Sequence, residues 1–366
     1  MTSDGRRSGM RRLTTSLFLF LLLLAGALPA RAELPAELKA LVVAAEKEGT
    51  LDLVWSESLL GGPEVVRQHQ AKMNERFGTH ITIAYTPGPE MARLGNQLLT
   101  EMKGGQKASS DVYVASAVQI QPLLGQSLFL AVSWSGLLPE RIPGAAVEAG
   151  GRALRIGTAL TGATYNTNLY KSTGQETLED FLKPEWRGKL ATTPYAAGFD
   201  VLAAADWWGA PKILDYLGKL SKQVAGFIRC GEDERVASSE YVAFALDCVS
   251  SDAILWHDKG APVGFFIPTD AAQVRYYYLT VPQHAQHPAA GVLFGLHLST
   301  EQGQALEWQA KRMDMHLYPE SRMRGMVEEN KAKGAEFREI TNQWVTDHPE
   351  IDPARTEMVK RLSQAK

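Results

Sequence analysis

Residues 51–55 (LDLVW), 81–85 (ITIAY) and 111–115 (DVYVA) decide the fold class of this chain. Each is a short run rich in β-branched, aromatic or other apolar residues, which is typical of a buried strand. Between them, apolar residues recur at helical spacing across residues 63–77 and 91–102. This βαβαβ order predicts a parallel sheet with helices on both faces.

The alternation of strands and helices starts again after about residue 156. No solenoid repeat and no low-complexity linker separates the two parts, so we expect two closely connected α/β halves. Further strands are predicted at residues 189–193, 224–228, 253–256, 263–267 and 276–281. Further helices are predicted at residues 199–208, 211–222, 233–246, 288–298 and 300–313, followed by a charged, largely helical tail from Pro319.

Composition and charge exclude some classes of function. The chain has 366 residues, of which 45% are hydrophobic and 22% charged, an ordinary globular balance. Residues 1–32 contain five arginines and one aspartate, so the remaining chain has 33 basic and 40 acidic residues and a net charge of −7. A mildly acidic body lacks the electrostatic footprint of a nucleic-acid-binding protein. After the N-terminal run, no segment has the 18 consecutive apolar residues of a membrane span.

Residues 1–32 are typical of a cleaved signal peptide. Four arginines lie between residues 6 and 12, an apolar run covers residues 17–25, and Ala30-Arg31-Ala32 fits the small-x-small cleavage pattern. We therefore expect the mature chain to start at Glu33 and to be located in the periplasm. The alternative is an uncleaved membrane anchor, for which the apolar run is short. No cysteine lies near the cleavage site, which argues against a lipid-anchored N-terminus.

Cys230 and Cys248 are the only two cysteines. In an oxidising compartment they can form a disulfide that closes a short loop and stabilises the fold by about 3 kcal/mol on the chain-entropy estimate. The alternative is two buried free thiols. No CxxC spacing is present, so no zinc site is predicted.

Small polar residues follow several predicted strands. Ligands of open α/β sheets bind beyond the carboxyl ends of the strands, where small residues let backbone N–H groups approach a ligand. Each of these segments is also compatible with an ordinary strand-to-helix turn. Their occurrence together at the same edge of two sheets favours a binding site. The segments are Ser56-Glu57-Ser58, Thr86-Pro87-Gly88-Pro89, Ala115-Ser116 and residues 193–198 (TPYAAG).

Across residues 36–310 the chain resembles the periplasmic solute-binding proteins of bacterial ABC importers, and within them the ferric-ion and small-ligand branch with the type II fold. Seven stretches in colinear order carry the resemblance, and residues 182–190 (LKPEWRGKL) are the most specific of them. The others are residues 41–49 (LVVAAEKEG), 109–113 (SSDVY), 164–169 (TYNTNL), 259–263 (KGAPV), 287–290 (HPAA) and 298–304 (LSTEQGQ).

The resemblance implies two lobes, each a mostly parallel sheet flanked by helices, joined by a hinge that closes on the ligand. The chain is expected to cross between the lobes near residues 155–162 and 275–280. The implied domains are a signal peptide (1–32), a first lobe (33–156 with 281–315) and a second lobe (157–280, with the tail 316–366). The implied partners are a small-molecule ligand and a membrane permease, and the protein is expected to be a monomer without a cofactor.

In the ferric branch, two adjacent tyrosines of the second lobe bind the metal. Counting back from Lys259-Gly260 places Ser250 and Ser251 at those positions, and serine hydroxyls are poor ferric ligands beside phenolates. We therefore predict no metal and a small polar ligand such as an organic acid, a phosphonate, a phosphate ester, or an amine held by Glu57. The predicted ligand-binding residues are Ser56, Glu57, Ser58, Gly88, Ser116, Thr161, Tyr195, Ala197, Gly198, Ser250 and Ser251.

Three other classes of protein are compatible with parts of this sequence pattern. One is a ferric-ion-binding protein of the same fold, and another is a receptor module that reports ligand to a signalling partner. A periplasmic hydrolase or lyase is the third, but the chain has no G-x-S-x-G elbow, H-E-x-x-H helix, Walker loop or dinucleotide fingerprint. The sequence therefore predicts a non-enzymatic binding protein.

Overall fold

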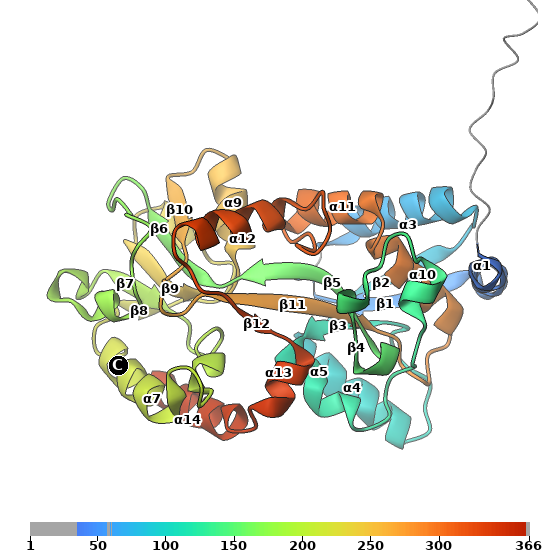
Figure 1. The fold of residues 1–366 in the computed structure, drawn as a ribbon, viewed down its shortest axis with the longest axis horizontal. Coiled ribbons are helices and arrows are strands. Elements are labelled where there is room, and N and C mark those ends of the chain that lie inside the picture. The colour runs from blue at the N-terminus through green and yellow to red at the C-terminus, as the bar shows by residue number, and fades with distance from the viewer. Residues whose placement is uncertain (1–34, 57–58, 60, 364–366) are drawn as a thin grey trace, which may run out of the picture. The chain divides into compact units, whose positions relative to one another are not determined.

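The computed structural model describes residues 35–56, 59 and 61–363. The predicted signal peptide and its cleavage site lie outside the described residues. The described chain is an α/β protein whose strands form three hydrogen-bonded sheets (Figure 1). The predicted α/β class is confirmed, but the two larger sheets combine parallel and antiparallel pairs rather than being mostly parallel.

The N-terminal part forms the predicted βαβαβ unit. Strands β1 and β2 pair in parallel, in a register that places Thr50 beside Thr82 and Trp55 beside Pro87. The backbone N–H of Asp52 donates to the carboxylate of Asp111, just before β3, so β3 lies next to β1. The elements are α1 (Ala36–Glu48), β1 (Thr50–Trp55), α3 (Pro63–Phe77), β2 (Thr82–Pro87), α4 (Met91–Lys103), β3 (Tyr113–Ser116), α5 (Ala117–Leu124), α6 (Trp134–Leu137) and two 3-10 turns, Gly144–Ala146 and Ala149–Gly151.

Two long antiparallel strands, β5 (Ala153–Leu160) and β11 (Gln273–Thr280), form the centre of the second sheet. Every residue of β5 is buried. β11 also pairs with β3, from Tyr277 beside Ser116 to Thr280 beside Tyr113. Both strands were predicted as extended crossing segments, and their extended conformation is confirmed. This sheet has the order β12-β11-β5-β4, with β4 (Val147–Glu148) and β12 (Arg338–Ile340) at its edges.

The third sheet, which we call the central sheet, has the strand order β10-β6-β9-β7-β8. Only Thr161 separates β5 from β6, so the chain passes directly from one sheet to the other. The elements of this part are β6 (Gly162–Asn166), β7 (Leu190–Thr192), η5 (Asp200–Ala203), α7 (Gly209–Leu220), β8 (Gly226–Phe227), α8 (Glu234–Ala237), β9 (Ala243–Asp247), α9 (Ser250–Asp258), β10 (Val263–Phe266) and two 3-10 turns, Glu179–Leu182 and Pro184–Trp186.

Three secondary-structure predictions in this part are wrong. The apolar run at residues 253–256 is not a strand but the middle of helix α9, because a short apolar run does not distinguish a buried strand from a buried helix. The helix predicted at 233–246 is one short helical turn, α8, followed by strand β9. The helix predicted at 199–208 contains only the 3-10 turn η5.

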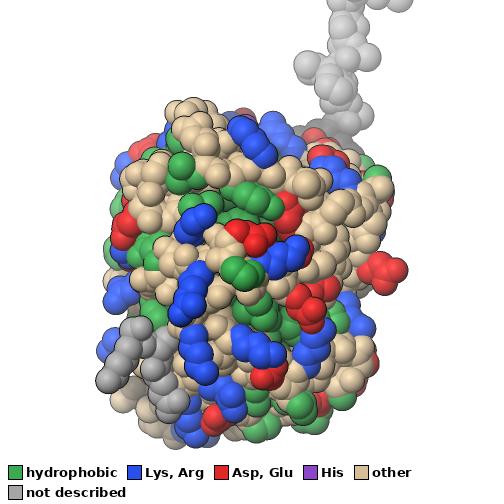
Figure 2. Space-filling model, turned by 90° about the vertical axis from the view of Figure 1, so that its left-hand side faces the viewer, with side chains coloured by type: hydrophobic (Ala, Val, Ile, Leu, Met, Phe, Trp, Pro, Cys, Tyr) green, Lys and Arg blue, Asp and Glu red, His purple; other side chains and the backbone are tan. Residues whose placement is uncertain are grey.

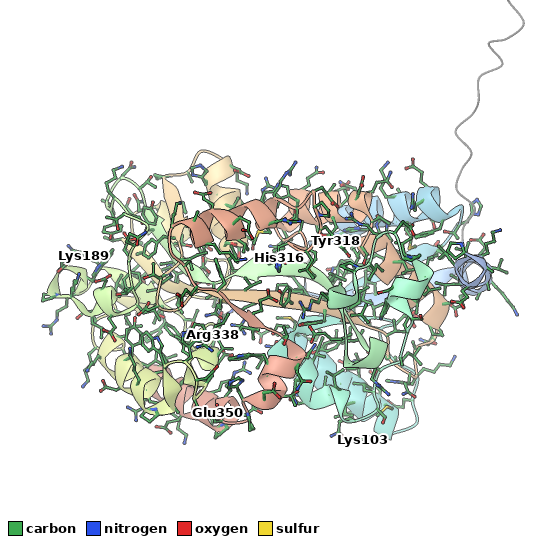
Figure 3. All side chains as sticks on the ribbon, viewed as in Figure 1. Lys103, Lys189, His316, Tyr318, Arg338 and Glu350 are labelled. Atoms are coloured by element: carbon green, nitrogen blue, oxygen red, sulfur yellow. A yellow bond between two sulfur atoms is a disulfide. The ribbon has the colours of Figure 1, made fainter. Side chains whose placement is uncertain are left out.

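The C-terminal segment contacts both α/β parts. Strand β12 pairs in parallel with the first residues of β11. Helix α13 packs against α5, and helix α14 packs against α7 and η5 (Figure 1). Figure 3 shows His316, Arg338 and Glu350 along this segment. Its elements, after α10 (Pro288–Leu298) and α11 (Glu301–Lys311), are α12 (Arg322–Ala332), β12, α13 (Asn342–Asp347) and α14 (Ile351–Ser363).

The same segment contributes to two hydrophobic cores. Ile340 and Val345 belong to the core that includes β3, α5 and β11. Ala354 and Met358 belong to the core of the central sheet. The short connection at residues 348–350 therefore joins the two cores a second time, apart from the sheet strands.

A buried polar cluster lies between helices α3, α10 and α11. His69 Nδ1 lies 3.0 Å from His297 Nε2, and His69 Nε2 lies 3.0 Å from Glu307 Oε1. All three side chains are at most 1% exposed. Burial lowers the pKa of His297 well below its usual value, and the neighbouring His69 lowers it further, so His297 stays neutral.

We predict that Glu307→Gln lowers the free energy of unfolding by about 3 kcal/mol, because removing one member of a buried polar pair leaves the other without compensation. Denaturant titration by circular dichroism measures the loss. Glu75→Gln is the matched control, since Glu75 is exposed and pairs only with Lys72 on the surface of α3. The control is expected to change stability by less than about 0.5 kcal/mol. Equal effects of the two substitutions would contradict a structural role for the buried cluster.

Candidate functional site

The predicted site residues of the N-terminal part lie at the ends of β1, β2 and β3. Ser56 follows β1, whereas Glu57 and Ser58 lie outside the described residues. Gly88 follows β2, and its N–H donates to the carbonyl of Trp55 at 2.8 Å. A Cβ at this position would lie 2.6 Å from Val54 Cγ1, so Gly88 is needed where β2 approaches β1. This contact gives Gly88 a structural role independent of any ligand.

Ser116 ends β3 and is 7% exposed. Its hydroxyl donates to the side-chain carbonyl of Gln119 in the first turn of α5. Its backbone register partner is Tyr277 on β11. Ser116 therefore lies beside one of the two strands that link the sheets.

Thr161 and Gly198 meet at the junction of the two sheets. The Thr161 hydroxyl is buried and donates to the carbonyl of Cys248 at 3.4 Å. Gly198 adopts φ +82°, and a Cβ there would lie 2.7 Å from Thr161 Cγ2. Both the left-handed backbone and the close approach require glycine at this position. The Gly198 carbonyl accepts a hydrogen bond from Gln273 Nε2 at 3.0 Å, which connects this turn to β11.

Tyr195 is held by the disulfide loop. The structure joins Cys230 and Cys248 in a disulfide with a Cα–Cα distance of 5.6 Å. The Tyr195 hydroxyl accepts a hydrogen bond from the Cys230 N–H at 2.8 Å. Burial raises the pKa of Tyr195, and the nearby Glu90 carboxylate, at the start of α4, adds to this increase. Glu90 belongs to the N-terminal part, and Tyr195 to the second α/β part. Ala197, in the same turn, is partly exposed.

Ser250 and Ser251 form the first turn of α9 and are 1% and 0% exposed. Neither hydroxyl has a hydrogen-bond partner among the described residues. A buried hydroxyl without a partner costs about 1–3 kcal/mol, so such groups call for a ligand or an ordered water. Of the predicted site residues, these two have the clearest unmet hydrogen-bonding capacity.

Sequence reasoning missed two side chains of the linking strand. Along β11, Tyr276 and Tyr278 point to one face, where their hydroxyls donate to Glu339 and Glu148. Arg275 and Tyr277 alternate with them and therefore point to the other face. Tyr277 pairs with Ser116, and Gln273, which precedes Arg275 on the same face, bonds to Gly198. The extended run of tyrosines, taken with period-two alternation, was the signal that could have identified this face.

Two buried carboxyls, Asp233 and Asp247, lie behind the site. The Thr164 hydroxyl donates to Asp247 Oδ2 at 2.5 Å, and both aspartates are 0% exposed. Burial raises the pKa of Asp233 to about 6. Burial and the charge of Asp233 raise the pKa of Asp247 well above its usual value. The pair therefore retains a proton well above the pH at which exposed carboxyls ionise.

Among the described residues, three side chains of types that can bind a metal ion also lie close together. They are Asp52, Asp111 and His287. Asp111 already accepts hydrogen bonds from the backbone N–H groups of Asp52, Gln286 and His287, and its Oδ2 lies 2.8 Å from His287 Nδ1. Asp111 precedes β3, so the group lies at the amino end of the strand, opposite the predicted site. These contacts give the cluster a structural role, because they connect β1, β3 and the start of α10.

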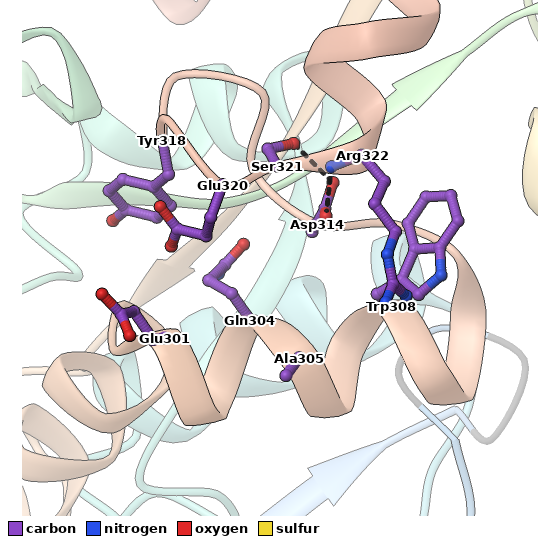
Figure 4. A pocket seen from close by; sticks show the side chains of 9 residues that line it. All are labelled: Glu301, Gln304, Ala305, Trp308, Asp314, Tyr318, Glu320, Ser321 and Arg322. Atoms are coloured by element: carbon purple, nitrogen blue, oxygen red, sulfur yellow. Dashed lines mark hydrogen bonds between the residues drawn. The ribbon is translucent and has the colours of Figure 1, made fainter.

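Two cavities lie elsewhere on the described chain. One of about 190 Å³ has Glu301, Glu320 and Tyr318 at one end and Arg322 beside Trp308 at the other (Figure 4). The other, of about 460 Å³, lies between β10, α9 and α12. No predicted ligand-binding residue lines either cavity.

The surface shows no broad apolar docking patch among the described residues. The large hydrophobic side chains that are exposed there are Val43, Leu169 and Val359, which lie on separate elements. Figure 2 shows Lys and Arg side chains mixed with acidic and apolar ones on the face at the left of Figure 1. In the part of the chain that the structure describes, no helix is long and apolar enough to cross a membrane.

Solved structures share this fold. The chain resembles the substrate-binding protein of an ABC transporter from Agrobacterium tumefaciens, with a TM-score of 0.67, 17% identity and coverage of 86% of this chain and 94% of that one. It also resembles the apo ferric ion-binding protein A of Pasteurella haemolytica, with a TM-score of 0.68, 13% identity and coverage of 87% and 100%. A third similar structure is the Trichodesmium protein IdiA (FutA) in complex with iron and citrate, with a TM-score of 0.63, 14% identity and coverage of 87% and 100%.

At these identities the similarity establishes the fold, which is that of substrate-binding proteins of ABC transporters. These similar structures are binding proteins rather than enzymes. No family model matches the chain, and no curated protein matches it.

We predict that Asp233→Asn flattens the dependence of stability on pH. A carboxyl whose pKa is raised by folding stabilises the protein at low pH, and this contribution is lost as pH rises from the ordinary value of 3.8 towards about 6. Asn mimics the protonated carboxyl, so at pH 8 the variant is expected to be about 3 kcal/mol more stable than the parent.

Denaturant titrations from pH 4 to pH 8 measure this effect. Asp215→Asn is the control, since Asp215 is exposed and pairs only with Lys219 on α7. An unchanged slope in Asp233→Asn would show that the pair does not retain its proton.

Proposed function

We propose that this protein is the periplasmic substrate-binding component of an ABC import system, which captures a small polar or anionic solute when two lobes close. The observation that carries this proposal is the pair of buried, unpartnered hydroxyls of Ser250 and Ser251 at the carboxyl end of β9. They lie in a fold shared with ABC substrate-binding proteins. Ligands of such sheets bind at this end of the strands.

The two lobes correspond to the two α/β parts. The first comprises residues 33–156 with 281–315, and the second residues 157–280, with β5 and β11 as the hinge. The tail, residues 316–366, contacts both lobes through α13 and α14. Ligand binding between the lobes stabilises the closed form by its higher affinity for that form.

The ligand contacts proposed from the first lobe are Ser56, Glu57, Ser58, Gly88 and Ser116. From the second lobe they are Thr161, Tyr195, Ala197, Gly198, Ser250 and Ser251. The signal peptide at 1–32 directs export to the periplasm, where the monomeric protein delivers its ligand to the membrane permease. The chain acts without catalysis and without a resident metal.

Ferric-ion binding is the second candidate, because two of the similar structures are described as a ferric ion-binding protein and as a complex with iron and citrate. Against it, the paired positions are serines, and ferric iron prefers anionic oxygen ligands. Tyr277 lies on the linking strand rather than at the start of α9. Tyr195 already accepts a hydrogen bond within the disulfide loop.

A ligand screen on the mature chain, residues 33–366, tests the proposal. The protein is stripped of bound solute by unfolding and refolding, then melted with organic acids, phosphonates, phosphate esters, amines, amino acids and ferric salts. A ligand at 100 times its Kd adds about 2.7 kcal/mol to stability. Saturable binding without turnover supports a binding protein, and consumption of the compound supports a hydrolase or lyase. A response to ferric salts alone supports the ferric alternative.

We predict that the double substitution Ser250→Ala, Ser251→Ala weakens binding of the identified ligand at least about tenfold. The melting temperature without ligand is expected to stay the same or rise, because two unpartnered buried hydroxyls are removed. Ser299→Ala is the control, since its buried hydroxyl donates to the Gly295 carbonyl at 3.2 Å. The control is expected to lower stability by about 1 kcal/mol and to leave affinity unchanged. Unchanged affinity in the double variant would remove these serines from the site.

A further inference from the structure

Strand β11 presents a cation on the face that points towards the site. Arg275 lies on the face of β11 opposite Tyr276 and Tyr278, with Gln273 and Tyr277 on either side of it. Gln273 contacts Gly198, and Tyr277 pairs with Ser116. Arg275 therefore lies between Gln273, which contacts the proposed second lobe, and Tyr277, which pairs with the proposed first lobe.

The guanidinium of Arg275 is partly buried and has few hydrogen-bond partners. Its side chain is 12% exposed, and its charge partner is Asp200 Oδ1 at 3.5 Å. Within the described ranges, the guanidinium makes no hydrogen bond to another residue. Guanidinium carries five N–H donors in a planar fork that matches carboxylate and phosphate oxygens. A partly buried guanidinium with unused donors is suited to an oxyanion ligand.

The local charge balance also favours an anion. Asp200 is 2% exposed and lies between two cations, with Arg355 Nε 4.0 Å from its other oxygen. Two guanidinium groups thus share one carboxylate, which leaves one positive charge. The nearest acid on α9, Asp252, is neutralised by Lys311 at 3.5 Å.

Helix α9, which begins with the unpartnered serines, packs beside the linking strands. It contacts β5, and β5 pairs with β11, where Tyr277 lies beside Gly157. Ser250 and Ser251 lie in the first turn of this helix. The charge of Asp252, in the same turn, adds to the effect of burial in raising the pKa of Tyr277, whereas the charge of Arg275 opposes it.

We propose that Arg275 binds a carboxylate, phosphate or phosphonate group of the captured solute, and that it thereby selects for anionic ligands. This inference rests on the proposed function, because it needs a solute in the cleft. It adds a charge-recognition residue from the hinge strand and restricts the solute to small oxyanions. Ser250 and Ser251 supply hydroxyl donors to the same ligand.

Isothermal titration calorimetry with inorganic phosphate, methylphosphonate, citrate and putrescine tests the proposal on the stripped mature chain. At least one of the three oxyanions is expected to bind, and the response identifies whether phosphate, phosphonate or carboxylate is preferred. Arg275→Gln is expected to weaken that binding at least about tenfold. Arg275→Lys is expected to lose part of the affinity, because lysine keeps the positive charge but lacks the planar guanidinium that donates two parallel hydrogen bonds. Arg187→Gln removes an exposed arginine of the same lobe and is expected to bind as the parent does.

Arg275→Gln leaves Asp200 with one cation fewer, so its folding is checked by circular dichroism. The double variant Asp200→Asn, Arg275→Gln also removes the Asp200 carboxylate that has lost a charge partner. It is expected to fold and still to lose oxyanion binding. Unchanged oxyanion affinity in either folded variant overturns the role of Arg275. Binding of putrescine alone, or of none of the three oxyanions at millimolar concentration, overturns selection for anions. Putrescine binding would leave the proposed binding function intact, whereas failure of every compound in the wider screen would count against that function itself.

Discussion

The antiparallel pairing of β5 with β11 is the constraint on which the rest of the structure depends. β5 continues into the central sheet after a single residue, Thr161, and β11 returns from the central part to pair with β3. On one face of this pair, Arg155 lies 4.1 Å from the Tyr276 ring centre and 2.6 Å from Glu148. This packing fixes which side chains of β11 face the C-terminal segment. Alternation along β11 then places Arg275 and Tyr277 on the opposite face, where Arg275 lies 3.5 Å from Asp200.

The C-terminal segment adds a second mechanical link between the two cores. Tyr276 donates to Glu339, and Arg338 and His348 both bond to Asp206, just after η5. Because α13 is anchored in one core and α14 in the other, any hinge motion must also be absorbed at residues 348–350. Hinge motion is usually absorbed by a few residues at the ends of elements, and here Thr161 and this connection meet that description. In the proposed closure, the tail would therefore act as part of the hinge as well as of the two lobes.

The sequence predicted those features that depend on local pattern. The βαβαβ unit, the extended crossing strands and most C-terminal helices follow from period and composition. The apolar run in α9 was mistaken for a strand, because only its packing against β10 distinguishes the two. The candidate ligand-binding residues remain a prediction, made from polar residues at strand ends. Arg275 was missed because its role depends on its pairing with Asp200, which is 75 residues away in the chain, and on the face of β11 that it occupies. Gly88 satisfies a close contact with Val54 that the sequence does not reveal.

A protein with a net charge of −7 after residue 32 can still favour an anion, because selectivity depends on the charges that face the ligand rather than on the total. Two acids of this region are paired with cations. Asp200 is shared by two arginines, and Asp252 pairs with Lys311. Burial keeps a proton on the pair formed by Asp233 and Asp247, so it contributes less negative charge than two free carboxylates would. The positive charge that remains lies on β11, where, in the proposed mechanism, both lobes contact the ligand only in the closed form. An oxyanion at Arg275 would therefore gain most of its stabilisation on closure, which is the differential affinity that a closing binding protein needs.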